Sequence, residues 1–185
     1  MRVAVDLLTF PFISGRHALD FVGTVGKRGS ADIERLQTAD DLARWSEEAG
    51  LGRSIADDAD LEAARRLREA LYSLVLSTLG DDPARPVDVA VVNEFASVET
   101  AAPSLGLRSG TIYRKDSAAP ASAVLAVVAR DGIDLLTGPD AALIRDCEDP
   151  TCTLLFVDTS RSHRRRWCSM NRCGARAKMR TLRST

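Results

Sequence analysis

Apolar residues recur at helical spacing through the first part of the chain. In the clearest stretch they share one face of a helix, at Leu61, Ala64, Leu67, Leu71, Leu74 and Val75. Asp60 can cap the start of this helix and Gly80 can end it. The width of the apolar stripe predicts a helix that packs against a core on one side.

Two further helices are predicted on either side of this one. Thr38 and Asp41 resemble a capping box, although Asp replaces the usual Glu or Gln. They open a helix over residues 39–49, which Gly50 ends. After a loop, a third helix is predicted over residues 86–98, because Pro86 suits the first turn of a helix.

The segment that follows is less regular. A strand is expected around residues 111–114. Residues 120–136 fit two structures, since the turn dipeptide Asp131-Gly132 favours a hairpin while the Ala, Leu and Asp content favours a helix. We favour the helix, which gives a mainly α N-terminal domain with an α+β fold as the alternative.

Composition limits the class of protein. With 185 residues, 45% apolar and 28% charged, the chain is long enough for a compact domain with a small appendage, and it is neither disordered nor collagen-like. Its longest nearly uncharged apolar stretch, residues 118–129, is far short of the roughly 20 residues of a membrane helix. Asp6 interrupts the N-terminal apolar run, which makes a poor signal peptide. We expect a cytoplasmic protein without membrane contact.

The formal net charge of −1 conceals a strong asymmetry. Residues 1–150 carry 16 Lys and Arg against 25 Asp and Glu, a net charge of −9. Residues 151–185 carry 9 Lys and Arg against one acid, Asp158, a net charge of +8. This split predicts a C-terminal appendage that binds a polyanion. The alternative is a basic tail that folds back on the acidic part of the chain.

Nothing in the N-terminal part indicates catalysis. It has no Gly-rich phosphate loop at a strand–helix junction and no plausible Ser/His/Asp set. Its many carboxylates are expected to form a solvated surface and helix caps. We therefore expect no catalytic residues and a protein that is not an enzyme.

The four cysteines carry the clearest chemistry. Cys147, Cys152, Cys168 and Cys173 form two C-x4-C pairs separated by fifteen residues. Such pairs suit a structural zinc ion, since each pair supplies two thiolates from one tight turn. Four thiolates complete a tetrahedral shell and leave no position for a catalytic water. Two disulfides are the alternative, but the missing signal peptide argues against an oxidising compartment. His163 could also replace one cysteine as a ligand.

The residues between and after the pairs predict a small finger. Residues 154–158 have strand character, residues 159–162 are turn-like, and residues 165–168 could return as a second strand. Gly174 leads into a helix over residues 175–183. A knuckle, which is the tight turn between Cys147 and Cys152, followed by a hairpin and a helix predicts a small treble-clef-like zinc finger with four cysteine ligands. The finger is expected over residues 141–185, after an α-rich domain over residues 1–140.

A specific set of residues around the cysteines carries a resemblance to a known family. The set comprises Phe156, Asp158, Ser160, Arg161, Arg166, Trp167, Cys168, Ser169, Met170, Cys173, Gly174, Arg176, Ala177 and Lys178. It resembles the CGNR zinc-finger family. Upstream, the run Ala18-Leu19-Asp20-Phe21-Val22 with Thr24 resembles the start of the ABATE domain that accompanies this finger. The resemblance covers nearly the whole chain.

The resemblance implies a function and shows two departures. The family is described as bacterial transcription regulators, some of them linked to stress responses, which implies zinc at the four cysteines, DNA contact by the finger and a helix at residues 120–136. The motif Cys-Gly-Asn-Arg is here Cys173-Gly174-Ala175-Arg176, so any base contact of that Asn is absent. Gly23 likewise stands where the N-terminal signature has Asn.

Arginine dominates the basic segment, and its paired donors match phosphate and guanine edges. The expected nucleic-acid-binding residues are Arg161, His163, Arg164, Arg165, Arg166, Arg172, Arg176, Lys178, Arg180 and Arg183. Among them, Arg176 and Arg180 are expected to reach bases, while Trp167 is expected to pack beneath the zinc site. We expect a zinc-dependent regulator of transcription that binds duplex DNA and whose N-terminal domain senses a small-molecule effector or forms a homodimer. The alternative is a protein- or RNA-interaction module with a purely structural finger.

Overall fold

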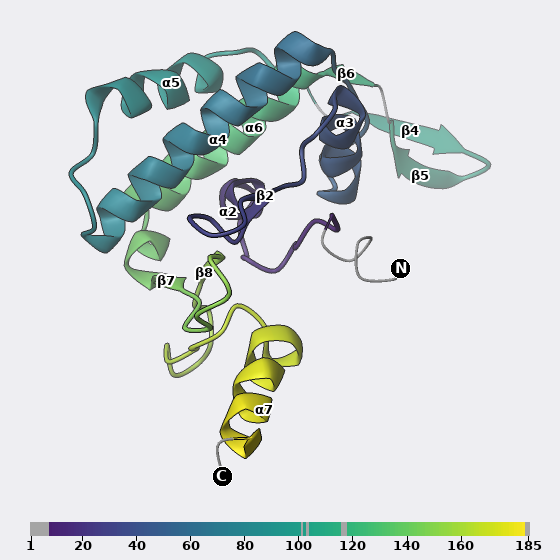
Figure 1. The fold of residues 1–185 in the computed structure, drawn as a ribbon. Coiled ribbons are helices and arrows are strands. Elements are labelled where there is room, and N and C mark those ends of the chain that lie inside the picture. The colour runs from purple at the N-terminus through teal and green to yellow at the C-terminus, as the bar shows by residue number, and fades with distance from the viewer. Residues whose placement is uncertain (1–7, 101, 103, 116–117, 184–185) are drawn as a thin grey trace.

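The computed structural model describes residues 8–100, 102, 104–115 and 118–183. Its first part is a helical body made of α2 (His17–Val22), α3 (Ala39–Glu48), α4 (Asp58–Leu79), α5 (Pro86–Ala96) and α6 (Ala121–Thr137). The helices α4, α5 and α6 pack on one another, and α2 packs against α4 and α6 (Figure 1). The core between them buries large apolar side chains, among them Leu19, Phe21, Trp45, Leu67 and Leu125. The prediction of a mainly α domain is therefore confirmed.

The helix ends follow the capping signals, with one correction. Thr38 and Asp41 form the predicted capping box of α3, and each side chain bonds the other residue's backbone amide. At α4, however, the N-cap is Asp57, whose side chain accepts the amide of Asp60. The prediction that Asp60 caps the helix was wrong, because Asp60 occupies the third position of a second capping box. Gly80 ends α4 in the left-handed conformation, with φ of 91°.

Residues 120–136 form a helix, not a hairpin. The dipeptide that favoured a turn lies inside α6, where each residue has a packing role. Asp131 accepts hydrogen bonds from the backbone amide of Ala18 at 2.8 Å and from Arg16 Nε at 2.9 Å, which ties the start of α2 to α6. Gly132 allows Leu71 to approach, since a Cβ at this position would lie 2.4 Å from Leu71 Cδ2.

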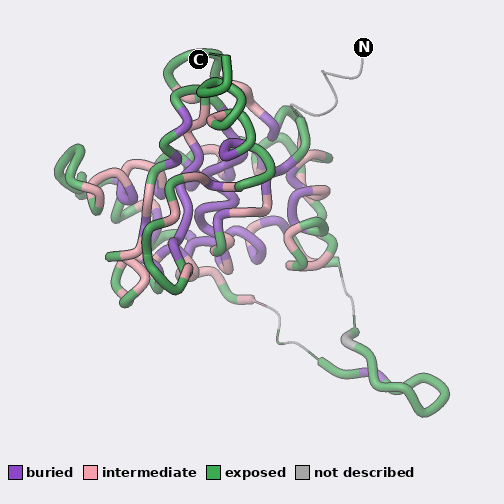
Figure 2. The backbone as a smooth tube through the Cα atoms, turned by 90° about the horizontal axis from the view of Figure 1, so that it is seen from below, coloured by how far each residue is buried: buried purple, intermediate pink, exposed green. Residues whose placement is uncertain are grey.

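Within the described ranges the strands are short and form four separate two-stranded sheets. Three pairs are antiparallel: β1 (Val25–Gly26) with β2 (Ile33–Glu34), β4 (Leu105–Arg108) with β5 (Thr111–Arg114), and β7 (Ile144–Asp146) with β8 (Leu155–Val157). The fourth pair, β3 (Ser54–Ile55) with β6 (Ala119–Pro120), is parallel. The strand expected around residues 111–114 is confirmed as β5. The hairpin that it forms with β4 stands away from the body (Figure 2).

The C-terminal finger contains β7, β8, the π-helical turn η2 (Met170–Gly174) and α7 (Ala175–Arg183), and the 3-10 helix η1 (Pro139–Leu143) connects it to α6. The expected return strand at residues 165–168 was wrong, because β8 pairs with β7, with Ile144 opposite Val157. The backbone amide of Arg165 instead donates to the Asp158 carboxylate at 2.8 Å, which closes a turn at this position. The finger therefore contains a hairpin followed by a helix, as expected, but its hairpin is formed by β7 and β8 instead of by β8 and residues 165–168. None of the helices in the described ranges is long and apolar enough to cross a membrane.

The strand β8 joins the finger to the body. Leu155 and Val157 belong to the core of the helical body, whereas Leu154 and Phe156 belong to a second core around the cysteines. Successive side chains of a strand point to opposite faces, which explains this division. The two regions therefore share one strand.

A buried ion pair holds β2 against α4. The guanidinium of Arg68 is only 4% exposed and donates to both carboxylate oxygens of Glu34, each at 2.7 Å. It also donates to Thr24 Oγ1 at 3.2 Å. The helical pattern was interpreted with Arg68 away from the apolar stripe, which was wrong, because Arg68 lies four residues after Ala64 and three before Leu71 and is buried with them.

Replacing Glu34 with Ala is expected to destabilise the fold by about 3 kcal/mol, because it removes the main partner of a buried charge. Thermal denaturation should then show a midpoint lower by roughly 6–12 °C. The matched control is Glu62→Ala, which removes the carboxylate of an exposed pair with Arg65. That change should cost less than about 1 kcal/mol, and equal losses in the two variants would contradict the role given to Glu34.

Candidate metal centre and basic finger

Local backbone turns position the four cysteines. Cys147 directly follows β7, and its amide donates to the Leu154 carbonyl at 3.1 Å, which extends the ladder between β7 and β8. Cys152 lies in the loop between these strands, where its amide donates to the Asp149 carbonyl at 2.8 Å. Cys173 lies in η2 at the start of α7, with its amide bonded to the Ser169 carbonyl at 3.0 Å.

The four thiols converge on one point. All four Sγ atoms lie within 4.8 Å of one another, and three of the cysteines are buried. The sulfur of Cys168 is 3.7 Å from that of Cys152 and 3.4 Å from that of Cys173. Four sulfurs arranged tetrahedrally at about 2.3 Å from an ion would lie about 3.8 Å apart, so the spacing fits a metal site. All four cysteines are free thiols, so the two-disulfide alternative is not what the structure contains.

The cluster favours one sulfur anion, at Cys152, because the hydrogen bond with Cys152 raises the pKa of the Cys168 thiol and burial raises the pKa of the Cys173 thiol to about 12. The hydrogen bond from the Cys168 thiol lowers the pKa of the Cys152 thiol to about 5, although burial acts in the opposite direction. The backbone amide of Cys168 points at Cys147 Sγ at 3.4 Å, and Arg176 Nη2 donates to Cys173 Sγ at 3.0 Å. Such donors offset the negative charge of a thiolate set and orient its members. The described cluster consists of cysteines alone, and His163 instead places Nδ1 2.9 Å from the Asp158 carbonyl.

A buried carboxylate beside the cluster organises the finger helix. Asp149 is fully buried and forms ion pairs with Arg176 at 3.0 Å and with Arg180 at 3.5 Å. Burial raises the pKa of Asp149, but the hydrogen bonds from Thr151 and from Arg176 outweigh this effect and lower it to about 2. One carboxylate thus ties the first cysteine turn to α7. No motif in the sequence predicted this role for Asp149.

Replacing Asp149 with Asn is expected to loosen α7 and leave the four sulfurs together. Asn can keep the hydrogen bonds from Thr151, but it lacks the charge that pairs with Arg176 and Arg180. Amide hydrogen exchange in α7 should become faster by roughly tenfold, since this contact is a main link between the helix and the knuckle. Asp140→Asn, which alters an ion pair with Arg16 in the body, should leave exchange in α7 unchanged. Unaltered exchange in D149N would refute the assignment.

The basic residues fall into two groups. In one group the guanidinium bonds to the finger itself. Arg165 lies over the Phe156 ring, with its Cζ 4.3 Å from the ring centroid, and donates to the carbonyls of Trp167 and Cys168. Arg166 pairs with Glu148 at 2.6 Å and lies over Trp167. Arg176 and Arg180, expected to reach bases, bond to Asp149, so their contact with DNA stays a prediction.

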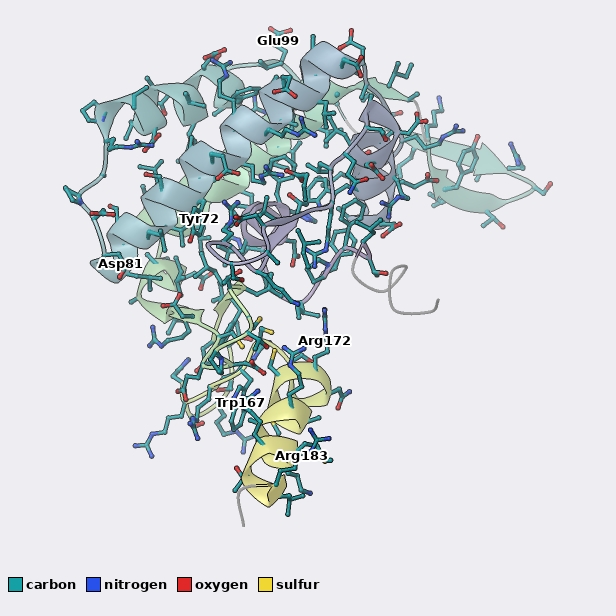
Figure 3. All side chains as sticks on the ribbon, in the orientation of Figure 1. Tyr72, Asp81, Glu99, Trp167, Arg172 and Arg183 are labelled. Atoms are coloured by element: carbon teal, nitrogen blue, oxygen red, sulfur yellow. The ribbon has the colours of Figure 1, made fainter. Side chains whose placement is uncertain are left out.

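In the other group the cations point to solvent. It comprises Arg161, Arg164, Arg172, Lys178 and Arg183, all of them exposed. Arg172 lies near the start of α7 and Arg183 lies at its far end, so these two members of the group lie at opposite ends of the helix (Figure 3). Arg172 lies close enough to the body to act on Arg35, whose pKa is lowered by burial and then by the charge of Arg172. Trp167 is half-buried and packs against the cysteine core, as expected.

The sequence matches two family models. Residues 15–139 match ABATE, described as "Putative stress-induced transcription regulator", and residues 144–184 match the CGNR zinc finger. No curated protein gives a significant match. Both departures from the family motifs lie next to the finger core. Ala175 opens α7, and a Cβ at Gly23 would lie 3.0 Å from Leu154 Cδ2.

Proposed function

Because the chain belongs to the ABATE family and carries a CGNR zinc finger, we propose that it is a zinc-dependent regulator of transcription that binds duplex DNA through the finger. The observation that supports this most directly is the separation of charge. The finger, residues 141–185, carries 10 Lys and Arg against 4 Asp and Glu, a net charge of +6, and five of its exposed cations lie outside the contacts with Glu148 and Asp149. Residues 1–140 carry 15 Lys and Arg against 22 Asp and Glu, a net charge of −7. An acidic body is repelled by DNA, so contact would be confined to the basic finger.

Zinc is the ion that best suits the site. Four thiolates without a water position make a closed structural shell, which holds the finger folded and supplies no reaction chemistry. The finger core is small and consists largely of the cysteines themselves, so metal binding would provide most of its stability. The N-terminal domain would sense a small-molecule effector or mediate self-association in the cytoplasm, without enzymatic activity.

The test is selection of binding sites from a random duplex DNA pool with intact protein whose zinc content has been measured. An enriched motif would support sequence-specific regulation and would show that Ala175 permits base readout. Retention that weakens with salt but yields no motif would reduce the function to phosphate binding. No retention at low salt would overturn the proposal.

A second function has one observation in its favour. The finger exposes the apolar side chains of Met170, Met179 and Leu182, with 66%, 50% and 63% of each accessible. Exposed apolar groups of this kind suit a protein surface better than phosphates. If the random duplex pool gives no retention, binding of this finger to an acidic protein surface becomes the preferred function.

A further inference from the structure

The hairpin of β4 and β5 forms a projecting arm, defined here as residues 104–115. Leu105 pairs with Arg114 and Leu107 with Ile112, and among the described strands each of the two pairs only with the other. The arm extends into solvent beside the helical body (Figure 2). An uncovered two-stranded ribbon is at best marginally stable in water, which raises the question of what covers it.

The two faces of the arm differ. On one face Tyr113 lies across Gly106, where a Cβ would be 2.3 Å from Tyr113 Cζ, and Arg108 lies 5.4 Å from the Tyr113 ring centroid. On the other face Leu105, Leu107 and Ile112 are 71%, 71% and 67% exposed. Three adjacent large apolar side chains at this exposure mark a surface that binds another apolar surface.

The charge of the arm indicates an acidic partner. Between residues 104 and 115 the chain has Arg108, Arg114 and Lys115 and no acidic residue. The part of the chain that carries the arm, residues 1–140, nevertheless has 22 Asp and Glu against 15 Lys and Arg, a net charge of −7. The body of this same protein is therefore a surface of complementary charge. DNA would satisfy the charge but would leave the apolar face uncovered.

The helical body also offers an apolar groove. It has a volume of about 280 Å³ and lies between α4, α5 and α6. Its lining includes the apolar residues Leu74, Val89, Val92, Ile133 and Leu136 together with four Ser, Thr and Asn side chains. Asp81 and Asp82, in the turn between α4 and α5, are exposed and lie at the same end of the body. Figures 1 and 3 show Asp81 at one end of α4 and the arm at the opposite end of the body. The arm of one chain therefore lies far from its own groove.

We propose that the arm docks into the groove of a second copy of this chain, and that the second copy returns the contact. Two chains lying side by side in opposite directions would each place an arm at the partner's groove. A mutual exchange closes under two-fold symmetry and gives a dimer instead of an open chain. Docking would cover Leu107 and Ile112 and protect the open strand edges.

The first measurement is the mass of the intact, zinc-loaded protein in solution, followed by sedimentation equilibrium over a range of concentrations. The wild-type protein should be a dimer. Leu107→Thr combined with Ile112→Thr should raise the dimer dissociation constant by at least about tenfold. Both residues are exposed in the single chain, so the circular dichroism spectrum should stay unchanged. The matched control, Met179→Thr combined with Leu182→Thr, removes two exposed apolar groups from α7 and should leave the dimer intact.

A second pair of variants tests the groove. Val89 lines the groove, whereas Val87, two residues earlier on α5, is 61% exposed and does not. Val89→Lys should therefore weaken the dimer, and Val87→Lys should not. Mixing the arm variant with V89K should restore part of the association, because each mixed dimer retains one intact arm–groove contact. Arm-to-arm pairing would show no such restoration.

Three results would overturn the proposal. They are a monomeric wild-type protein at about 100 µM, an arm variant that dimerises as well as the wild-type protein, and no restoration on mixing. A monomeric protein whose arm variant loses affinity for duplex DNA would instead make the arm a nucleic-acid contact.

Discussion

Removing the metal from the intact protein is expected to unfold the finger while the helical body stays folded. A structural zinc site contributes on the order of 10 kcal/mol, and the finger has little apolar core besides its cysteines. The two tryptophans report on the two regions separately, since Trp45 is fully buried in the body and Trp167 packs on the cysteine core. With Trp45→Phe, chelation should shift the remaining emission to the red. With Trp167→Phe, the emission of Trp45 should stay nearly unchanged.

Cys168→Ser provides the same test without a chelator. It removes the sulfur that lies between those of Cys152 and Cys173, and no other cysteine exists to replace it. Protease cleavage should then begin in the arginine-rich residues after 160 and spare α4 and α6. The expectation fails if verified metal removal leaves both the emission of Trp167 and the cleavage pattern as they were.

Replacing Arg161 and Arg164 with Gln is expected to weaken duplex binding by roughly 10–100-fold at low salt, because both side chains are exposed and their guanidinium groups carry the donors that bind phosphates. If the finger neutralises about five phosphates, a plot of the logarithm of the binding constant against the logarithm of the salt concentration should have a slope near −4 to −5. Loss of two contacts should reduce that slope by about 1.8. A titration of labelled duplex at several salt concentrations measures both quantities.

The control for this prediction removes equal charge from the body. Arg53 and Arg66 are both exposed there, and Arg53→Gln combined with Arg66→Gln changes the net charge by the same amount. Affinity and slope should then remain close to those of the wild-type protein. A similar loss in both double variants would mean that overall charge, and not the finger surface, determines binding.

Much of the local structure was predictable because its signals are local. The capping box of α3, the glycine that ends α4 and the helix over residues 175–183 each depend on a few neighbouring residues. The grouping of the four cysteine sulfurs at one site was also predictable from a local signal, because the two members of each C-x4-C pair lie close together in the chain.

The strand partner of β8 and the role of Asp149 were not predicted, because both depend on contacts between segments that are distant in the chain. The choice of β7 as the partner of β8 is supported by the amide of Val157 bonding to the Ser14 carbonyl and that of Asp158 bonding to the Leu143 carbonyl. Asp149 was missed for a further reason. Dividing the charges at residue 150 assigned Glu148 and Asp149 to the acidic body, although the structure shows them as counter-charges of the finger's own arginines.

The division of side chains along β8 limits how independent the finger can be. A fragment that begins at residue 144 would carry Leu155 and Val157 without the helices that cover them, so it would be expected to aggregate even when loaded with metal. Transfer of the finger to another protein would require a host surface shaped for the same two side chains. The family boundary between residues 139 and 144 thus separates two stretches of sequence but not two interchangeable modules.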